Sequence, residues 1–457
     1  MSGIASTATG GEWERLKPDE KLDARVKQWL SPVGVDFIDP EVRHSYQGRV
    51  RRFMDAVRLR PTDRIPVSPN VGFFPSSYAN ITPHEAMYDY DKLAGAIARF
   101  HRDFKPDSLR SSSIYGPGPM FDLLDYKLYR WPGHGLELTA PAQYVESEYM
   151  KPEEYDVLIQ DPSGYFMRRF LPRIFGSLEG FQALGVATDN LNIGRHPGYF
   201  SHFAEPAVRA ALSAMLEAGQ AAQAWRHACA LIDRRVIGQH GIPLWLGTAP
   251  TNAPFDIIGD TLRGTRGIMT DLFRRPERVL AAMERFVPLA IDMGVRGADA
   301  AGVPFSYVPL HKGAQGFMST KDFERFYWPT LKALILGLVD QGIVPLLFVQ
   351  GSYDLPRLEI IAGSGIPAGA TVWLFDKTDM RQVKQQLGSW ACIAGNVPLS
   401  LLQAGTPSDV RTYVKRLIDD VAQDGAFVLS TGAVIDQAKP ENVHALIDAG
   451  LDCGTHR

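Results

Sequence analysis

Short apolar runs alternate with longer segments of helical periodicity, most regularly in the C-terminal half of the chain. The apolar runs are "IVPLLFVQG" (343–351), "TVWLFD" (371–376), "WACIAGNV" (390–397) and "AFVLSTGAV" (426–434). The segments between them, such as "PSDVRTYVKRLIDDVAQDG" (407–425), have helical spacing. Strands that are apolar throughout and separated by helices predict a parallel sheet buried on both faces.

The N-terminal half repeats this alternation less regularly. "SYQGRVRRFMDAVRLR" (45–60) predicts a helix, and "RIPVSPN" (64–70) predicts a short strand after it. "PHEAMYDYDKLAGAIARFHRDF" (83–104) predicts one long helix. An alanine-rich block over 203–241 predicts another, which Gly241 ends as a C-cap glycine would. "IPLWLGTAP" (242–250) then predicts a strand that enters a loop.

These elements predict an α/β protein. The chain length and the number of βα units favour a (β/α)8 TIM barrel over 46–457, preceded by an N-terminal helical extension over 1–45. That extension is expected to pack on the barrel or on a second copy of the chain, so a homodimer is a further expectation. There is no GxGxxG after the first strand and no GxxxxGK[ST], which disfavours the open-sheet nucleotide-binding folds.

Composition narrows the class of partner. The 457 residues carry a net charge of −3 and the basic residues are dispersed, so we expect no nucleic-acid partner. No apolar run approaches the roughly 18–20 residues that cross a bilayer, and the N-terminus does not have the pattern of a secretory signal. The three cysteines form no recognisable framework. We therefore expect a cytoplasmic protein with reduced thiols and no membrane partner.

In such barrels the reactive groups lie where strands end and βα loops begin. Aromatic rings and neutral amides dominate these places, which favours a small, partly apolar or aromatic substrate over a polyacid. The predicted substrate-binding residues are Asn70, Phe73, Phe74, Tyr115, Asn192, Arg195, His196, Trp245, Asn252, Gln350, Tyr353 and Asn396.

Two of these assignments have alternatives that the sequence leaves open. Trp245 is either a wall of the pocket or a core residue. The loop "NLNIGRHPGYFSHF" (190–203), which holds Asn192, Arg195 and His196, is polar and aromatic enough to bind an anionic or aromatic group. The spacing of six between His196 and His202 fits no standard pair of metal ligands, so we predict no metal.

The predicted catalytic residues are His311, Asp376 and Lys377, because each follows a run with strand character. His311 can act as a general acid or base near neutral pH, and Asp376 can orient it or bind a cationic group. The alternative for His311 is a loop histidine that neighbours satisfy. For Asp376 and Lys377 it is a helix cap followed by a solvated lysine.

Three C-terminal motifs carry a resemblance to a known family: Gly-Asn-Val at 395–397, Gly-Thr-Pro at 405–407 and Pro-Glu-Asn-Val at 440–443. Together with "FMDAVRLRPTDRIPV" near the N-terminus, they resemble the uroporphyrinogen decarboxylase superfamily over about residues 45–452. The resemblance implies a (β/α)8 barrel. It also implies one of two chemistries: decarboxylation of uroporphyrinogen without a cofactor, or methyl transfer between a corrinoid protein and an acceptor, often with zinc.

For both chemistries, this sequence departs from the family's pattern at the residues that matter. The decarboxylases carry an RQAGRYLPEY-type stretch that binds many carboxylates, whereas this chain has "SPNVGFFPSSYANITPHEA" (68–86), without arginine. The zinc methyltransferases place His and Cys two apart at a strand end that matches Phe348 and Gln350. Their third ligand, a Cys, falls near "STGAV" (430–434). Phe, Gln and Thr cannot build a tetrahedral zinc site.

The resulting prediction is a methyltransferase of the demethylase type, acting on a small methylated or methoxylated substrate. We expect no tightly bound cofactor, and methylcobalamin on a separate corrinoid protein is the implied methyl carrier. His311 is the predicted proton donor, with Gln350 and Asn396 as positioners. A cofactor-independent lyase or decarboxylase on a small substrate, and a non-catalytic small-molecule binder, remain alternatives.

Overall fold

The computed structural model describes residues 10–454. Five parallel strands form its main sheet in the order β4-β5-β6-β7-β8, and three short strands form a separate sheet in the order β2-β1-β3. The strands are β1 (Tyr129–Pro132), β2 (Gly135–Leu136), β3 (Gln143–Tyr144), β4 (Phe305–Leu310), β5 (Val344–Val349), β6 (Val372–Phe375), β7 (Cys392–Val397) and β8 (Phe427–Thr431).

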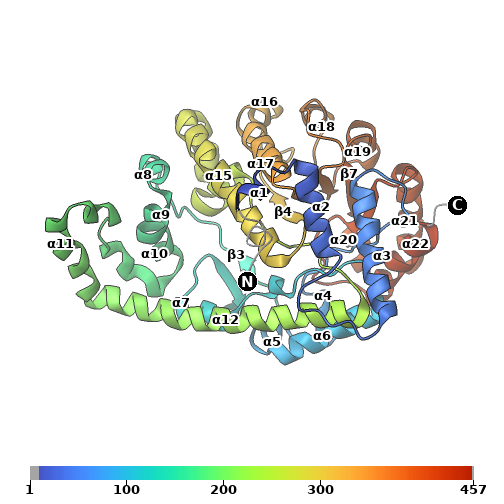
Figure 1. The fold of residues 1–457 in the computed structure, drawn as a ribbon, viewed down its shortest axis with the longest axis horizontal. Coiled ribbons are helices and arrows are strands. Elements are labelled where there is room, and N and C mark those ends of the chain that lie inside the picture. Colours follow the sequence, from blue (N-terminus) through green and yellow to red (C-terminus); the bar gives the residue numbers. More distant parts are fainter. Residues whose placement is uncertain (1–9, 455–457) are drawn as a thin grey trace.

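Helices make up most of the rest of the chain (Figure 1). Those before the main sheet are α1 (Gly10–Trp13), α2 (Pro18–Trp29), α3 (Pro40–Val57), α4 (Phe74–Tyr78), α5 (Pro83–Tyr88), α6 (Tyr90–Phe104), α7 (Gly118–Leu124), α8 (Tyr155–Gln160), α9 (Pro162–Tyr165), α10 (Leu171–Ile174), α11 (His196–Ser201), α12 (Pro206–His240), α13 (Pro254–Asp256), α14 (Gly264–Arg274) and α15 (Pro276–Ala301). Those between and after its strands are α16 (Thr320–Asp322), α17 (Trp328–Asp340), α18 (Leu355–Ala362), α19 (Met380–Leu387), α20 (Leu399–Ala404), α21 (Pro407–Val421) and α22 (Pro440–Cys453).

The remaining helical segments are 3₁₀ helices, which are wound more tightly than an α-helix, and π-helices, which are wound more widely. The 3₁₀ segments are η2 (Ser112–Tyr115), η4 (Gly176–Ala183), η5 (Ala187–Leu191), η6 (Ile193–Arg195) and η7 (His202–Ala204). The π-helical segments are η3 (Phe166–Phe170), η8 (Ile257–Leu262) and η9 (Phe323–Tyr327).

The main sheet confirms the predicted parallel arrangement. Its strands pair in register from Phe305 opposite Val344 to Val397 opposite Thr431. Three short segments, 65–71, 107–110 and 242–248, link the edge strands β8 and β4 to one another through main-chain hydrogen bonds. These bonds measure 2.8 to 3.0 Å and join Ser68 to Leu429, Asp107 to Val67, Leu109 to Pro243 and Tyr307 to Thr248.

Alternate residues of each strand face opposite sides of the sheet, as strand geometry requires. One side packs with the N-terminal helices and includes Phe305, Tyr307, Leu346, Phe348, Leu374, Ala394 and Val428. The other side packs under the connecting helices and includes Val308, Leu310, Leu347, Val349, Trp373, Phe375, Ile393 and Leu429. Both sets are buried, which is why the strands are apolar without alternation.

The N-terminal helices pack on the domain itself. Trp29 is buried, with its ring 5.2 Å from the ring of Phe305, and Arg25 pairs with Asp299 over 2.6 Å. The segment thus packs on the domain, which is one of its two expected positions. Helix α3 (Pro40–Val57) runs across residue 45, and the division of the chain at that residue stays a prediction, as does the homodimer. Residues 1–9 of the predicted extension lie outside the described range.

One predicted helix is wrong in detail. The segment 83–104 is two helices, α5 and α6, which meet at Asp89. The Asp89 side chain accepts a hydrogen bond from the backbone N–H of Lys92, so it caps the start of α6. The alanine-rich helix is confirmed as α12, 35 residues long, and Gly241 follows it with φ of +61°.

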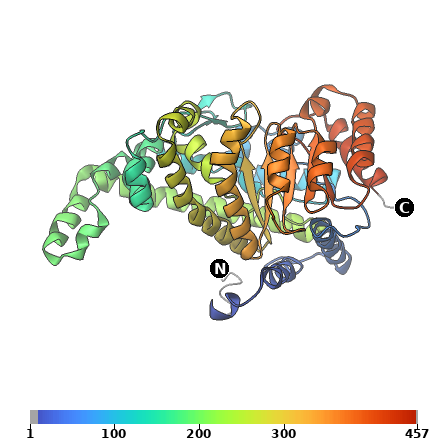
Figure 2. The ribbon, with the colours of Figure 1, turned by 90° about the horizontal axis from the view of Figure 1, so that it is seen from above.

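A helical arm, residues 171–218, projects from the side of the sheet (Figures 1 and 2). It contains α10, η4 to η7, α11 and the first part of α12, and the sequence did not predict it. A small apolar cluster that includes Leu178, Phe181 and Ala211 forms its core. At 1.5 Å per residue, α12 is about 50 Å long, so it reaches from the arm to the N-terminal helices.

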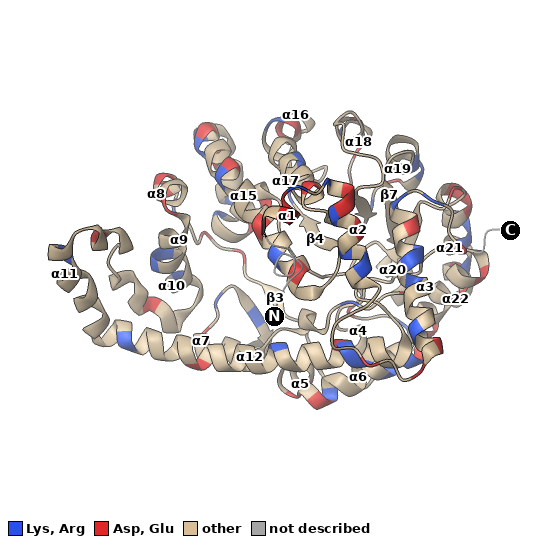
Figure 3. Ribbon diagram, in the orientation of Figure 1, with Lys and Arg blue, Asp and Glu red and all other residues tan. Residues whose placement is uncertain are grey.

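Acidic and basic residues are interspersed along the helices (Figure 3). Cys229 and Cys392 are buried, Cys453 is exposed, and all three are free thiols. Within residues 10–454, the structure contains no helix that is both long and apolar enough to cross a bilayer.

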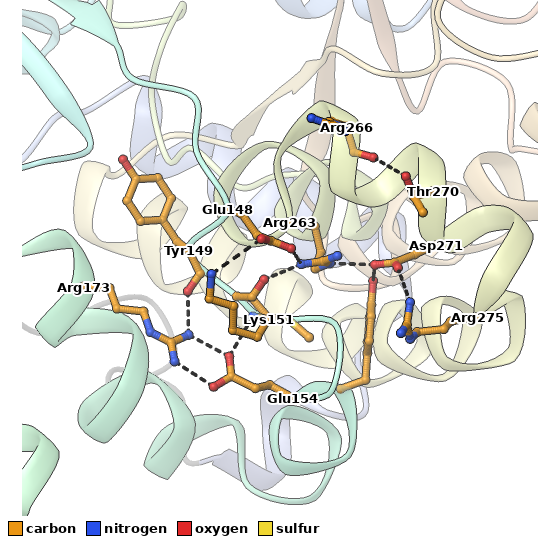
Figure 4. Close-up of polar contacts among 12 residues, drawn as sticks. Glu148, Tyr149, Lys151, Glu154, Arg173, Arg263, Arg266, Thr270, Asp271 and Arg275 are labelled. Carbon is orange, nitrogen blue, oxygen red and sulfur yellow. Dashed lines mark hydrogen bonds and ion pairs between the residues drawn. The ribbon is translucent and has the colours of Figure 1, made fainter.

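A buried ionic network fixes the segment after the π-helical turn η8 (Figure 4). Arg263 is 3% exposed; its Nε donates to Asp271 over 2.6 Å and its Nη1 donates to Glu148 and to the carbonyl of Met150. Asp271 also accepts a hydrogen bond from Tyr155 over 2.9 Å. This network ties η8 and α14 to the chain that leads into α8.

Replacing Asp271 with alanine removes the buried carboxylate that pairs with Arg263. Removing one member of a buried ion pair costs about 3–5 kcal/mol, and Arg263 then keeps only the partly exposed Glu148 as a charged partner. We therefore expect the free energy of unfolding in urea to fall by that order. The matched control is Asp292→Ala, which breaks the exposed i,i+4 pair with Arg296 and is expected to leave the unfolding midpoint unchanged. Equal effects from the two substitutions would contradict this role of Asp271.

Candidate functional site

The site lies at the carboxyl end of β4, where the turn η8 approaches it. Asp256 ends α13, and Asp260 lies on η8 (Ile257–Leu262). His311 and Lys312 directly follow β4. Single π-helical turns inside helices are frequent at functional sites, because the wider turn re-aims side chains. Here the spacing of four places both carboxylates against the residues after β4.

Asp260 is paired with two bases at once. The Nδ1–H of His311 donates to Oδ2 of Asp260 over 2.5 Å, and Lys312 Nζ lies 2.9 Å from Oδ1. Lys312 Nζ also donates to the hydroxyl of Thr265 over 2.8 Å. The Lys312 side chain is buried, whereas that of His311 is 39% exposed. His311 therefore presents the rest of its ring to solvent while Asp260 fixes its orientation.

Asp256 is a buried carboxylate that holds the chain after β4. It accepts hydrogen bonds from the backbone N–H groups of His311 and Lys312, each over 3.0 Å. Its Oδ2 also accepts from the hydroxyl of Tyr327 over 2.7 Å. These three bonds satisfy the carboxylate, so Asp256 positions the His311 backbone and does not contact the imidazole.

Two glycines allow this close packing. A Cβ on Gly259 would lie 2.7 Å from Cδ of Lys312, so the missing side chain leaves the path of the lysine clear. A Cβ on Gly313 would lie 2.5 Å from the hydroxyl of Tyr353. A larger residue at 259 would press on Lys312, and one at 313 would press on Tyr353 and Tyr327.

The electrostatics of the site favour a protonated His311. Burial by itself lowers the pKa of His311, but the hydrogen bond to Asp260 and the negative charges of Asp256 and Asp260 outweigh it and raise that pKa. Burial and the charge of Asp260 raise the pKa of Asp256. Burial acts in the same direction on Asp260, but the contacts with His311 and Lys312 lower its pKa overall. These shifts favour an ionised Asp260 beside a protonated His311.

Asp376 does not orient His311, contrary to one of the predicted roles. Its Oδ2 accepts from the backbone N–H of Gly351 over 3.1 Å, which ties the ends of β5 and β6 together. Burial raises the pKa of Asp376. Asp260 makes the predicted contact instead, because η8 and not the β6 loop reaches the end of β4.

Lys377 and Asn396 line a different hollow, between α19 and α21. This pocket has a volume of about 430 Å³, and its lining also includes Arg381, Tyr413 and Arg416. The Asn396 amide is fully engaged: Nδ2 donates to the carbonyls of Asp376 and Thr378, and Oδ1 accepts from the hydroxyl of Tyr413. Asn396 therefore holds the loop after β6 in place.

Phe73 lines a second hollow, of about 210 Å³, together with Ser77, Ile81, Asp436 and other residues of the loops after segment 65–71 and β8. Tyr115 packs edge-on against Phe73, with ring centroids 4.8 Å apart. The backbone N–H of Phe73 donates to Asp436 over 2.9 Å. Asn70 is fully buried at the end of the same segment and accepts a hydrogen bond from Arg110.

Several predicted residues lie in the core or on the arm. Phe74 packs against Phe100 and Phe104, and Trp245 packs against Phe53 with ring centroids 4.5 Å apart. Both are buried core residues. The predicted loop of Asn192, Arg195 and His196 is part of the helical arm, away from the strand ends (Figure 1), so the structure does not bring these residues to the site.

The remaining predicted residues lie at strand ends without contacting His311. Gln350 is half-buried, and its backbone N–H donates to Leu310 over 3.1 Å. Asn252 is half-buried directly after Thr251, which bonds to β4. Tyr353 is buried and packs edge-on against Phe323. Their roles in binding stay predictions.

The positions that match zinc ligands do not form a zinc site. Phe348 is buried against the ring of Tyr307, with centroids 6.1 Å apart, and the Thr431 hydroxyl donates to the carbonyl of Ala433. Neither offers a thiolate or imidazole donor. Across residues 10–454, no three His, Cys, Asp or Glu side chains converge as metal ligands would.

The sequence reasoning missed Asp256, Asp260, Tyr327 and Arg110. The two aspartates follow the strand-like run "IPLWLGTAP" in "TNAPFDIIGD" (251–260), and their spacing of four was a usable signal. The approach of η8 to β4 could not be predicted, because a π-helical turn has no reliable sequence pattern.

The pKa of His311 provides a direct test of this geometry. In Asp260→Asn the imidazole loses its charged partner, so we expect the pKa of His311, followed by NMR titration of the ring protons, to fall relative to the wild-type protein. Asp376→Asn is the matched control, since Asp376 makes no contact with His311, and it is expected to leave that pKa unchanged. A fall in the control of the same size would contradict the assignment of Asp260.

Comparisons with known proteins give the family context. Residues 190–451 match the family model described as uroporphyrinogen decarboxylase (URO-D). The chain is 26% identical over 221 residues to a uroporphyrinogen decarboxylase of Syntrophotalea carbinolica, covering 48% of this chain and 61% of that protein. It is 25% identical over 232 residues to one of Neisseria meningitidis serogroup C, covering 48% and 59%. The chain thus spans about three fifths of the length of these curated relatives.

Among solved structures, a methyltransferase from Methanosarcina mazei is similar with a TM-score of 0.55 at 15% sequence identity. The match covers 88% of this chain and 97% of that one. At this level of identity the similarity concerns the fold and not the reaction.

Proposed function

The chain belongs to the uroporphyrinogen decarboxylase family, and from this premise we propose that it is a methyltransferase of the demethylase type. Its substrate is a small molecule with a methyl group on oxygen or another heteroatom, and a separate corrinoid protein exchanges the methyl group with it. The single observation that carries the proposal is the His311–Asp260 pair at the end of β4, which supplies a proton beside solvent-accessible space.

The fold supports this proposal. The main-chain links between β8, the three short segments and β4 support a closed (β/α)8 barrel, in which active sites lie at the carboxyl ends of the strands. His311, Asp260 and Asp256 lie at that end. The chain belongs to a family of enzymes, and its fold is similar to that of a methyltransferase. Both observations support an enzyme over a non-catalytic binder.

The reaction requires a proton donor at the leaving atom. When a methyl ether is cleaved, the carbon–oxygen bond breaks with both electrons on oxygen, the methyl group passes to an acceptor, and the oxygen takes a proton. A reduced corrinoid supplies the nucleophile for such a methyl group when it is present on its carrier protein. His311 donates the proton, while Asp260 holds the ring and stabilises the imidazolium. Asp256 and Tyr327 position the His311 backbone through the contacts described above.

Decarboxylation is the second function that an observation favours, because the curated relatives are named as decarboxylases. In that reaction a carbon–carbon bond breaks, carbon dioxide leaves, and the carbanion takes a proton, for which His311 is equally placed. The two reactions differ in their requirements. Release of carbon dioxide without any added corrinoid protein would select decarboxylation over methyl transfer.

His311→Gln tests the proton donor. Loss of a positioned general acid lowers rates by roughly 10²–10⁴-fold, so we expect kcat for methyl transfer from a methoxylated substrate to fall by that order. The assay follows methylation of a reduced corrinoid carrier by its absorbance. The matched control, His196→Gln, changes a histidine on the helical arm and is expected to keep wild-type turnover. Full activity of His311→Gln would remove the assigned role.

The pH dependence of kcat/KM gives an independent test. A proton donor must be protonated, so the rate is present below the pKa of His311 and is lost as pH rises through it. Because the pKa of His311 is raised, we expect this loss above about pH 6.5, the ordinary histidine value. In Asp260→Asn the same limb is expected to move to lower pH. A profile identical in the two proteins would show that another group donates the proton.

A further inference from the structure

Arg110 is a buried cation with no acidic partner. Four arginines are buried among the described residues, and three of them pair with a carboxylate: Arg25 with Asp299, Arg263 with Asp271 and Arg357 with Asp354. Arg110 is 8% exposed, and among residues 10–454 no Asp or Glu lies within ion-pair distance of it. A buried charge without a partner is costly, so its presence calls for an explanation.

Neutral groups occupy only part of the guanidinium. Nη1 of Arg110 donates to Oδ1 of Asn70. The central guanidinium carbon, Cζ, lies 5.6 Å from the ring centroid of Tyr307. Nε of Arg110 is buried and has no hydrogen-bond acceptor within the described chain. Nδ2 of Asn70, also fully buried, has no acceptor either. Nε of Arg110 and Nδ2 of Asn70 are therefore two adjacent buried donors without an acceptor. Both residues lie close enough to the Tyr307 hydroxyl to act against the burial that raises its pKa.

The backbone of Gly247 packs closely against the Arg110 side chain. A Cβ on Gly247 would lie 3.1 Å from Nε of Arg110, and Gly247 has φ of +68°, a conformation that other residues rarely adopt. A side chain there would press against the donor. The backbone thus approaches Arg110 closely without covering Nε with an acceptor.

Arg110 lies at the same end of the sheet as His311. Asn70 and Arg110 follow the short segments that bond to β8 and to 242–248. Tyr307, which packs against Arg110, lies four residues before His311 on β4, at most about 13 Å away at the rise of a strand. Asp436, which lines the hollow of about 210 Å³ with Phe73, lies close enough for the charge of Arg110 to act against the burial that raises its pKa.

From these contacts we propose that Arg110 and Asn70 bind a carboxylate of the substrate. The carboxylate accepts from Nε of Arg110 and from Nδ2 of Asn70, the two buried donors that have no acceptor within the described chain. This deepens the proposed function by naming a substrate class: a small carboxylic acid that also carries the methylated heteroatom. It rests on that function only for the methyl group, because the anion site is defined by its own residues.

The chemistry of the site selects a single planar anion. A guanidinium edge matches the two oxygens of a carboxylate, which gives strong and directional hydrogen bonds. One unpaired arginine neutralises one charge, so the site fits a monoacid and not the many carboxylates of a tetrapyrrole. The rings of Tyr307 and Phe348 next to it favour an apolar or aromatic body on that acid.

The test measures binding of benzoate and of its neutral isostere benzamide to the full chain by titration calorimetry, without a corrinoid protein. We expect the wild-type protein to bind benzoate at least about tenfold more tightly than benzamide, because only benzoate pairs with the charge. Arg110→Gln is expected to remove that preference and leave benzamide binding unchanged. The matched control, Arg209→Gln, alters an exposed arginine on α12 and is expected to keep the preference.

Asn70→Asp is a second variant, which tests the proposal even if Arg110→Gln does not fold. It places a carboxylate against Nη1 in the same shape, so the protein neutralises Arg110 itself. We expect a thermal midpoint no lower than that of the wild-type protein and loss of the benzoate preference. Equal affinity of the wild-type protein for benzoate and benzamide, or a preference that survives both substitutions, would overturn the proposal.

The outcome is separable from that of methyl transfer. Benzoate binding requires no turnover, so a benzoate preference that depends on Arg110 supports the anion site even where methoxylated acids are not demethylated. Conversely, methyl transfer that is lost in His311→Gln but unchanged in Arg110→Gln would retain the proposed function and overturn the carboxylate site.

Discussion

Asp260 lies 2.5 Å from Nδ1 of His311 and 2.9 Å from Nζ of Lys312, and the chemistry proposed for the site depends on this shared carboxylate. One aspartate between two bases stays ionised, because both contacts lower its pKa. The ionised aspartate in turn orients the imidazole and helps to raise its pKa. Without it, His311 would be a partly exposed loop histidine with an ordinary role.

The rest of the architecture serves to hold Asp260 there. The parallel strands bring His311 to one end of the sheet, and the π-helical turn η8 brings Asp260 to meet it. Arg263 follows η8 directly and is anchored by Asp271, Glu148 and the Met150 carbonyl. Asp256 fixes the backbone on the opposite side through two N–H groups. Buried charges therefore connect the packing of α14 to the geometry of the proposed proton donor, His311.

Most of the fold could be predicted from the sequence, because apolar strands and periodic helices have strong patterns. The strands β5 to β8 and the long helix α12 are where the pattern indicated them. The helical arm could not be predicted, since its short 3₁₀ and α-helical pieces form a separate apolar cluster without a regular period. The break between α5 and α6 could not be predicted from the apolar pattern either. There a single side chain, Asp89, caps the second helix and decides whether one helix or two form.

The site was predicted only in part, for a physical reason. His311 was found because it follows a strand, but its partner is 51 residues earlier in the chain and meets it only through the fold. Asp376, the predicted partner, is at the correct end of the sheet and bonds instead to Gly351. Strand ends identify which residues gather at one edge. They do not identify which of them touch.

The dependence of the methyl-transfer rate on the acidity of the leaving group tests the central claim most directly. A series of substituted methyl phenyl ethers varies the pKa of the phenol that leaves. If His311 protonates the leaving oxygen, the wild-type rate depends weakly on that pKa and the rate of His311→Gln depends on it steeply. Equal slopes in the two proteins would contradict proton donation by His311.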